Sequence, residues 1–353
     1  MKFGLNFFPV FTPDRKTGAQ YFREVLELSK LADAFGFEHV QTVEHYGTPY
    51  GGYSPDPVTL LAAIAAVTER IRITTGAVIP AFTHPLKLAG KLAMLDNLSD
   101  GRLDVGFGRG FLPEEFEWFG VPMDESRRRF AEGVEACRRL WSETDVVFDG
   151  EFSSFGPVTL LPRPIQQPTP PIFLASASSA ESCAAAGAAG YHLQVVPSIV
   201  SHGELLEMLA AYRGAWPGNT SGRIQIKYTC YLSEDRDEAL QRGEELENNY
   251  VALMSQAVAS WAQTRSDQYA GYEKLIDKVR RYDFGKSLTD CKVLAGTPGD
   301  VAQQLTSIRD WYGDDLSVSI QINPGYLDYE TSERTLRLFA DEVLPLFDSG
   351  NQA

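Results

Sequence analysis

The segment DVGFGRGFLPEEFEWFG, residues 104–120, has three glycines on alternate positions around a single arginine, Arg109, and then a helix-start signal. The apolar run before it reads as a strand, and Pro113 with two glutamates suits the first turn of a helix, where the carboxylates oppose the helix dipole. A glycine-rich turn and a helix N-terminus beside a guanidinium together can form a binding site for a phosphate. A tight turn whose arginine pairs with a neighbouring carboxylate fits these residues equally well. A nicotinamide-binding βαβ unit fits less well, because its acidic residue roughly 20 positions later would fall in the polar stretch GVPMDESRRR.

Short apolar or β-branched runs alternate with helical patterns along the chain, which predicts a parallel sheet with crossover helices. The predicted strands are 2–8, 39–44, 72–79, 103–108, 171–176, 192–197, 223–232 and 317–322. The predicted helices are 19–34, 57–68, 85–98, 125–141, 180–189, 203–216, 237–261, 299–312 and 329–346. Eight alternations favour an α/β fold of the (β/α)8 TIM-barrel type over a doubly wound sheet, and we expect one domain over residues 1–353.

Two segments interrupt the alternation. Residues 146–171 contain the hairpin pattern FDGEFSSFG and then the proline-rich PRPIQQPTPP, which cannot form a regular helix. Residues 262–295 carry charges and tyrosines but few aliphatic side chains. We therefore expect a hairpin insertion in the first segment and a mobile lid in the second.

Composition and charge exclude several classes of function. A formal net charge of −15 argues against binding to nucleic acid or to an anionic membrane surface, since both need a basic footprint. No apolar run is long enough to span a membrane, and the first residues read as a strand rather than a signal peptide, so we expect a cytoplasmic protein. The four cysteines and five histidines lack the spacing of metal ligands, and we expect no metal.

In a barrel of this type the chemistry lies where the strands end at their carboxyl sides. Glu44, His45 and Tyr46 follow the second predicted strand, and the hydroxyl-rich SASSAES follows the fifth. Glu181 lies three residues after Ser178, which predicts a capping box with Ser178 as N-cap, and the same N–H groups can hold a phosphate. We expect His45 to face a ligand, because an imidazole can exchange a proton at neutral pH, although a structural histidine is the alternative. Tyr46 is expected to serve packing.

Four stretches together resemble the bacterial luciferase-like flavin monooxygenases, and the likeness runs from about residue 1 to 190 and weakens afterwards. They are TVEHYG (42–47), TTGAVIPAFTHPLKLAGKLAMLDNLSDGRLDVGFGRG (74–110), EFEWFGVPMDESR (115–127) and FLASASSAE (173–181). The resemblance implies a (β/α)8 barrel that binds reduced FMN, with His45 as the catalytic histidine and a non-proline cis peptide at Gly76–Ala77. The cofactor-binding residues that it implies are Gly76, Ala77, Gly108, Arg109, Arg127, Ser176, Ser178 and Ser179. On this view the glycines let the backbone approach FMN, and Arg109 holds its phosphate after the fourth strand.

The sequence departs from the luciferase catalytic subunit at three places. Gly108 replaces a cysteine near the flavin, Tyr46 replaces a second histidine, and Ala175 replaces an acidic residue. Light emission is therefore not implied. What the resemblance implies is an FMNH2-dependent monooxygenase that inserts one atom of O2 into a small organic substrate through a flavin C4a-(hydro)peroxide, by hydroxylation, epoxidation or a Baeyer–Villiger route.

The expected protein partners and the alternative functions follow from the same family resemblance. No second nucleotide motif is evident, so we expect a separate flavin reductase, and the resemblance implies a homodimer or heterodimer. An F420-dependent oxidoreductase and a non-catalytic flavin-binding subunit are the alternatives, and His45 argues against the second. Aromatic side chains near the expected loops favour an apolar substrate. They are Phe7, Phe8, Phe11, Tyr50, Tyr53, Phe82 and Phe111.

Overall fold

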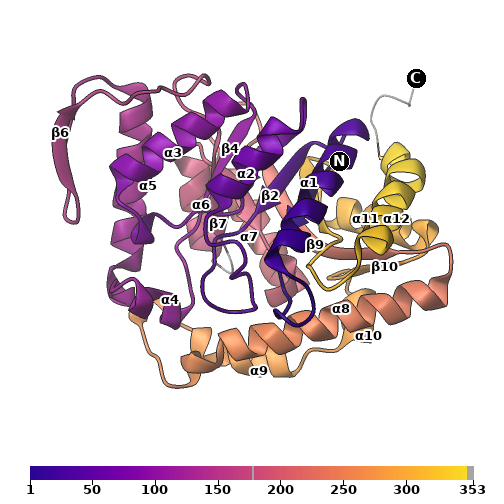
Figure 1. The fold of residues 1–353 in the computed structure, drawn as a ribbon. Coiled ribbons are helices and arrows are strands. Elements are labelled where there is room, and N and C mark those ends of the chain that lie inside the picture. The colour runs from indigo at the N-terminus through magenta and orange to yellow at the C-terminus, as the bar shows by residue number, and fades with distance from the viewer. Residues whose placement is uncertain (177–178, 348–353) are drawn as a thin grey trace.

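The computed structural model describes residues 1–176 and 179–347, and within them parallel strands form a closed eight-stranded barrel surrounded by helices (Figure 1). The strands pair in the order β1, β2, β3, β4, β7, β8, β9 and β11, and β11 pairs with β1 to close the barrel. Their bounds are Lys2–Phe7, His39–Thr42, Arg72–Thr75, Leu103–Phe107, Ile172–Ser176, His192–Val195, Ile224–Leu232 and Leu316–Gln321. The TIM-barrel prediction is confirmed.

Most of the helices begin at a residue whose side chain caps the first turn. At α2, for example, the Asp56 carboxylate accepts from the N–H groups of Val58 and Thr59, and Pro57 is the first helical residue. The helices are α1 Gly18–Ala34, α2 Pro57–Ala66, α3 Pro85–Leu98, α4 Pro113–Trp118, α5 Ser126–Ser142, α6 Ala180–Ala188, α7 His202–Ala215, α8 Arg236–Ala257, α9 Leu275–Arg280, α10 Phe284–Thr289, α11 Pro298–Tyr312 and α12 Tyr329–Leu338.

Several elements differ from the prediction in their bounds or in number. Strand β3 ends at Thr75 rather than at residue 79, because the chain turns through a cis Gly76–Ala77 bond and then forms only an isolated bridge from Val78 to Phe107. A three-residue strand, β10 (Leu294–Gly296), pairs with the end of β9 and overlaps the end of the predicted lid. The last helix breaks after Leu338 into a π-helical turn and a 3-10 turn.

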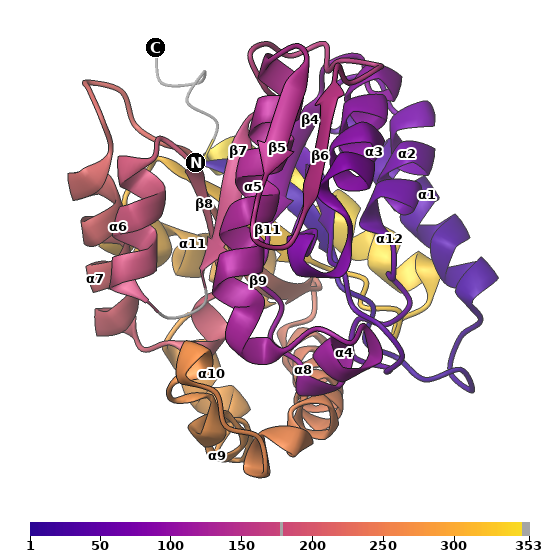
Figure 2. The ribbon, with the colours of Figure 1, turned by 90° about the vertical axis from the view of Figure 1, so that its left-hand side faces the viewer.

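Both predicted interruptions correspond to structure outside the barrel. Strands β5 (Val146–Asp149) and β6 (Ser154–Val158) form the expected antiparallel hairpin, which extends beside α5 (Figure 1). The segment 262–295 holds short helical turns together with α9 and α10, and both views place these elements with α4 and α8 across one end of the barrel (Figures 1 and 2). Apolar residues of this segment pack with those of α4 and α8 in a cluster separate from the main core. Its mobility stays a prediction.

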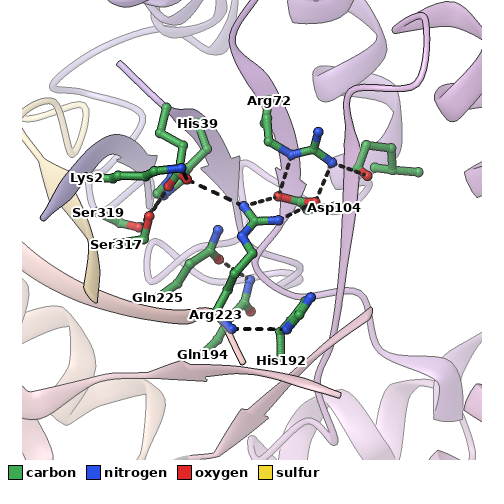
Figure 3. Close-up of polar contacts among 12 residues, drawn as sticks. Lys2, His39, Arg72, Asp104, His192, Gln194, Arg223, Gln225, Ser317 and Ser319 are labelled. Atoms are coloured by element: carbon green, nitrogen blue, oxygen red, sulfur yellow. Dashed lines mark hydrogen bonds and ion pairs between the residues drawn. The ribbon is translucent and has the colours of Figure 1, made fainter. Parts of the chain in front are cut away.

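The opposite end of the barrel interior, at the amino ends of the strands, is filled by a charged network that we call the floor network (Figure 3). Asp104 is fully buried and accepts two hydrogen bonds each from Arg72 and Arg223, at 2.6–3.0 Å. Burial raises the pKa of Glu38, but the hydrogen bond and charge of His39 together with two nearby cations outweigh this effect and lower it to about 2. The floor network therefore closes the barrel at the end remote from α4.

Candidate active site

His45 lies just beyond β2 at the mouth of the barrel, the end that α4 and α8 cover. Its ring is buried and packs against Phe8, Tyr50 and Phe111, with ring centroids 5.6, 5.6 and 5.8 Å away. Its Nδ1 lies 2.9 Å from Oε1 of Glu115, a fully buried carboxylate on α4. A carboxylate at this distance holds the proton on Nδ1 and leaves Nε2 as the nitrogen that can accept one. The pair can therefore act in acid–base chemistry.

The role of Glu115 corrects the sequence interpretation, in which it only opposed the dipole of α4. Its Oε1 accepts from the backbone N–H of Tyr46 at 2.9 Å as well as from His45, so this carboxylate fixes both residues after β2. Within the described ranges its Oε2 is buried without a hydrogen-bond partner. No local signal could reveal this pairing, because 70 positions separate the two side chains in the sequence.

Glu44 and Tyr46 form a second polar contact at the same mouth. The Tyr46 hydroxyl donates to Oε1 of Glu44 at 2.6 Å, and the Ile79 N–H donates to Oε2 at 3.0 Å. Burial raises the pKa of Glu44 to about 7 despite these two bonds. The ring of Tyr46 packs edge-on against Phe119 at 4.6 Å, so this residue combines the expected packing with a hydrogen bond.

The backbone segments after β3 and β4, which carry glycine or alanine, lie side by side at this end of the barrel. The predicted cis peptide is present at Gly76–Ala77, and a Cβ on Gly108 would lie only 3.2 Å from the Cβ of Ala77. Gly110 adopts a φ of 74°, which favours glycine. Gly106 has a structural reason instead, since a Cβ there would meet the carbonyl oxygen of Thr75 at 2.1 Å inside the barrel wall. The alternating glycines thus do not share one purpose.

Arg109 and Arg127, the two predicted phosphate-binding residues, reach neighbouring residues of one segment. The Arg109 guanidinium lies over the ring of Tyr269, 4.2 Å from its centroid, and Arg127 donates from Nε to Gln268 at 3.2 Å. Among residues 1–176 and 179–347, neither arginine forms an ion pair with a carboxylate. This finding argues against the alternative in which Arg109 pairs with a neighbouring acid.

The serine cluster follows β7, which is the parallel neighbour of β4. Ser176 is the last residue of β7, so its backbone leaves the barrel at the same edge as that of Arg109. The N-cap of α6 is Ser179, which accepts from the Ser182 N–H at 3.2 Å, and not Ser178 as the capping-box pattern predicted. Ser178 lies outside the described residues.

Of the seven aromatic residues singled out in the sequence, four belong to or pack on the apolar cluster at the mouth and three belong to or pack on the main core. Phe8, Tyr50 and Phe111 surround His45, whereas Phe82 stacks on Phe119 at 4.7 Å. The others belong to the main core or pack on it, as do Phe7, Phe11 and Tyr53. A cavity of about 150 Å³ lies beside Glu115. Residues that line it include Thr48, Pro49, Leu112, Glu115, Trp118 and Leu253.

Two kinds of feature are absent from the described ranges. No helix there has the length and apolar character needed to cross a membrane. No group of three or more histidine, cysteine, aspartate or glutamate side chains is arranged to hold a metal ion in that part of the chain.

Comparisons with known proteins agree with the resemblance. The family model for luciferase-like monooxygenases matches residues 1–315. The oxygenase component of flavin-dependent trigonelline monooxygenase from Acinetobacter baylyi is 35% identical over 98% of this chain and 96% of its own. An FMNH2-dependent dimethylsulfone monooxygenase from Pseudomonas putida is 25% identical over 91% of this chain and 86% of its own.

Solved structures of similar proteins share the fold of this chain. The crystal structure of monooxygenase RslO1 from Streptomyces bottropensis is 48% identical, with a TM-score of 0.89 over 99% of this chain and 100% of that one. An F420-dependent tetrahydromethanopterin reductase from Methanopyrus kandleri is 19% identical, with a TM-score of 0.67 over 98% and 99% of the two chains. This last likeness is one of fold alone.

Proposed function

We propose that this chain, which belongs to the luciferase-like monooxygenase family, uses reduced FMN and O2 to insert one oxygen atom into a small apolar organic substrate. Relatives whose names specify a flavin-dependent monooxygenase and an FMNH2-dependent monooxygenase support this reaction and this cofactor. The reaction is hydroxylation, epoxidation or a Baeyer–Villiger oxidation.

The observation that carries the proposal is the pair of guanidinium groups at the mouth that have no carboxylate partner among the described residues. Arg109 and Arg127 contact adjacent residues of one segment, and such groups suit the phosphate of FMN. At Gly108 the backbone carries no side chain, and a Cβ there would lie 3.2 Å from the Cβ of Ala77, so this stretch suits close approach by a flat ring system. The residues present therefore fit FMN.

His45 and Glu115 would perform the proton chemistry in this proposal. Bound reduced FMN supplies the activation of O2. Glu115 keeps the proton on Nδ1 of His45, and Nε2 then holds or accepts a proton of the reacting groups. The rings of Phe8, Tyr50 and Phe111 pack on the His45 ring, and such apolar neighbours would limit the access of water to it.

Other parts of the proposal concern partners and location. The name of one relative as an oxygenase component supports a separate reductase that supplies FMNH2. We propose further that the protein acts in the cytoplasm as a dimer and that residues 262–295 close over the loaded site.

Anaerobic titration of the purified protein with FMNH2, FMN and reduced F420, followed by oxygen uptake, tests the function. We expect FMNH2 to bind and the complex to consume O2, with hydrogen peroxide released when no substrate is present. Preference for reduced F420 without oxygen consumption would replace the proposal with an F420-dependent oxidoreductase. Binding of FMNH2 without accelerated oxygen consumption would instead indicate a non-catalytic flavin-binding subunit.

A further inference from the structure

A lysine lies inside the barrel below the mouth, and the proposed chemistry does not use it. Lys227, in the middle of β9, is half-buried and donates from Nζ to the carbonyl oxygen of Gly76 at 2.7 Å. Within residues 1–176 and 179–347 it forms no ion pair with a carboxylate. Burial lowers its pKa to about 8, so most molecules still carry the ammonium at pH 7. The barrel interior thus contains a cation without a counter-charge.

A buried amide lies against the same backbone position. Gln41 on β2 is fully buried, and neither its Nε2 nor its Oε1 has a hydrogen-bond partner among the described residues. A Cβ on Gly76 would lie 2.7 Å from Oε1 of Gln41 and 3.0 Å from Nζ of Lys227. Glycine at position 76 therefore leaves room for both polar groups. A buried amide with both ends unpaired is unfavourable and indicates a polar group that completes its bonds.

We propose that Lys227 and Gln41 form one subsite that binds the polar N1–C2=O edge of the flavin ring and favours its reduced, anionic form. The amide supplies one donor and one acceptor, which suits the alternating N–H and C=O groups of the flavin pyrimidine ring. Reduced flavin carries a negative charge at N1 near neutral pH, whereas oxidised flavin is neutral there, so the ammonium distinguishes the two forms. Lys227 is thus a positioning and selectivity residue. This inference rests on the proposed function.

The test compares the affinities of the protein for FMNH2 and for FMN, measured anaerobically without organic substrate. Lys227→Met should reduce the preference for FMNH2 over FMN by about tenfold or more, because it removes the charge that only the reduced form matches. Lys227→Arg should retain most of this preference. Lys30→Met, which removes the same charge from the exposed surface of α1, should change neither affinity.

Gln41→Leu provides a second variant that does not depend on the stability of the lysine variants. It should weaken FMNH2 and FMN by a similar factor, because both forms of the ring offer hydrogen bonds to the amide. Thermal unfolding of each variant shows whether the barrel remains folded.

The outcomes separate this inference from the proposed function. If the wild type binds neither form of FMN, the proposed function fails. If the wild type binds FMNH2 but Lys227→Met lowers both affinities equally, or changes neither, Lys227 does not select the reduced form and the inference alone is wrong. An unchanged preference with weaker binding of organic substrate would assign the ammonium to the substrate and also overturn the inference.

Discussion

The two ends of the barrel interior treat buried polar groups in opposite ways. In the floor network Asp104 is matched by two arginines, and Glu38 lies among His39 and two cations. At the mouth Lys227 has no counter-charge and the Gln41 amide has no partner within the described ranges. The Oε2 atom of Glu115 likewise has no hydrogen-bond partner within those ranges. Both ends are polar, and they differ in whether the buried charges have partners of opposite charge.

This difference indicates which end of the barrel stabilises the fold and which end binds ligands. A buried charge network stabilises a fold only when its groups are paired, and the charged groups of the floor network are paired with one another. Unpaired buried groups cost stability and persist where a ligand completes them. Substitutions at the floor should therefore change stability, and those at the mouth should change binding and chemistry.

The largest effect expected is the loss of coupled oxygenation in His45→Ala. This variant should fold and bind FMNH2, but product formation should fall about 10²–10⁴-fold, the range for general acid–base groups. Oxygen should then appear as hydrogen peroxide. Single-turnover mixing of the reduced complex with O2 and substrate, with product and peroxide both quantified, measures the effect.

A histidine elsewhere gives the matched control for this experiment. His202 begins α7, is exposed, and bonds to the Tyr312 hydroxyl at 2.7 Å rather than to Glu115, so His202→Ala should keep the yield of oxygenated product. A wild-type yield from His45→Ala would leave His45 as a structural histidine at the end of a strand.

The next largest effect should fall on stability at the floor. Asp104→Asn removes the charge that two arginines share, and breaking a buried pair in this way costs about 3–5 kcal/mol. Urea denaturation measures the loss. Glu333→Gln breaks an exposed pair with Arg337 on α12 and should cost less than about 1 kcal/mol. A similar small cost for Asp104→Asn would mean that the floor network does not stabilise the barrel.

The sequence reveals most of the fold because each strand is a local run of apolar or β-branched residues between helical patterns. Prediction from the sequence fails for features that depend on backbone geometry or on contacts between distant residues. Strand β3 stops at the cis bond rather than at the end of its apolar run, and β10 exists only through its pairing with β9. The family resemblance singled out His45 and Arg109 as candidates, and it predicted the cis peptide that the structure contains. The contacts of Glu115 and Lys227 span 70 and 151 positions, and no pattern within either segment indicates them.

A third prediction concerns the pH dependence of stability, and it tests whether the mouth destabilises the fold. Burial raises the pKa of Glu44 from 4.5 to about 7, so between these values the folded state holds a proton that the unfolded state has lost. Stability should therefore fall as pH rises from about 4.5 to about 7 and then level off, by about 3 kcal/mol at about 1.4 kcal/mol per pKa unit. Glu44→Gln should remove this decline. Urea denaturation from pH 4.5 to 8 compares the two slopes, and equal slopes would show that Glu44 is not the group responsible.

The smallest effect should be on cofactor affinity in Arg109→Ala. A charge-assisted contact with phosphate is worth roughly 1.5–3 kcal/mol, so FMNH2 binding should weaken about tenfold to a hundredfold. A phosphate anchor acts equally in the ground and transition states, so turnover at saturating FMNH2 should change little.

Arg128→Ala is the control, because Arg128 lies next to Arg127 in α5 but pairs with Glu151. Free riboflavin, which lacks the phosphate, should bind the Arg109→Ala variant and the wild type equally well. Equal loss for riboflavin would mean that Arg109 supports the mouth by its contact with Tyr269 rather than by binding phosphate.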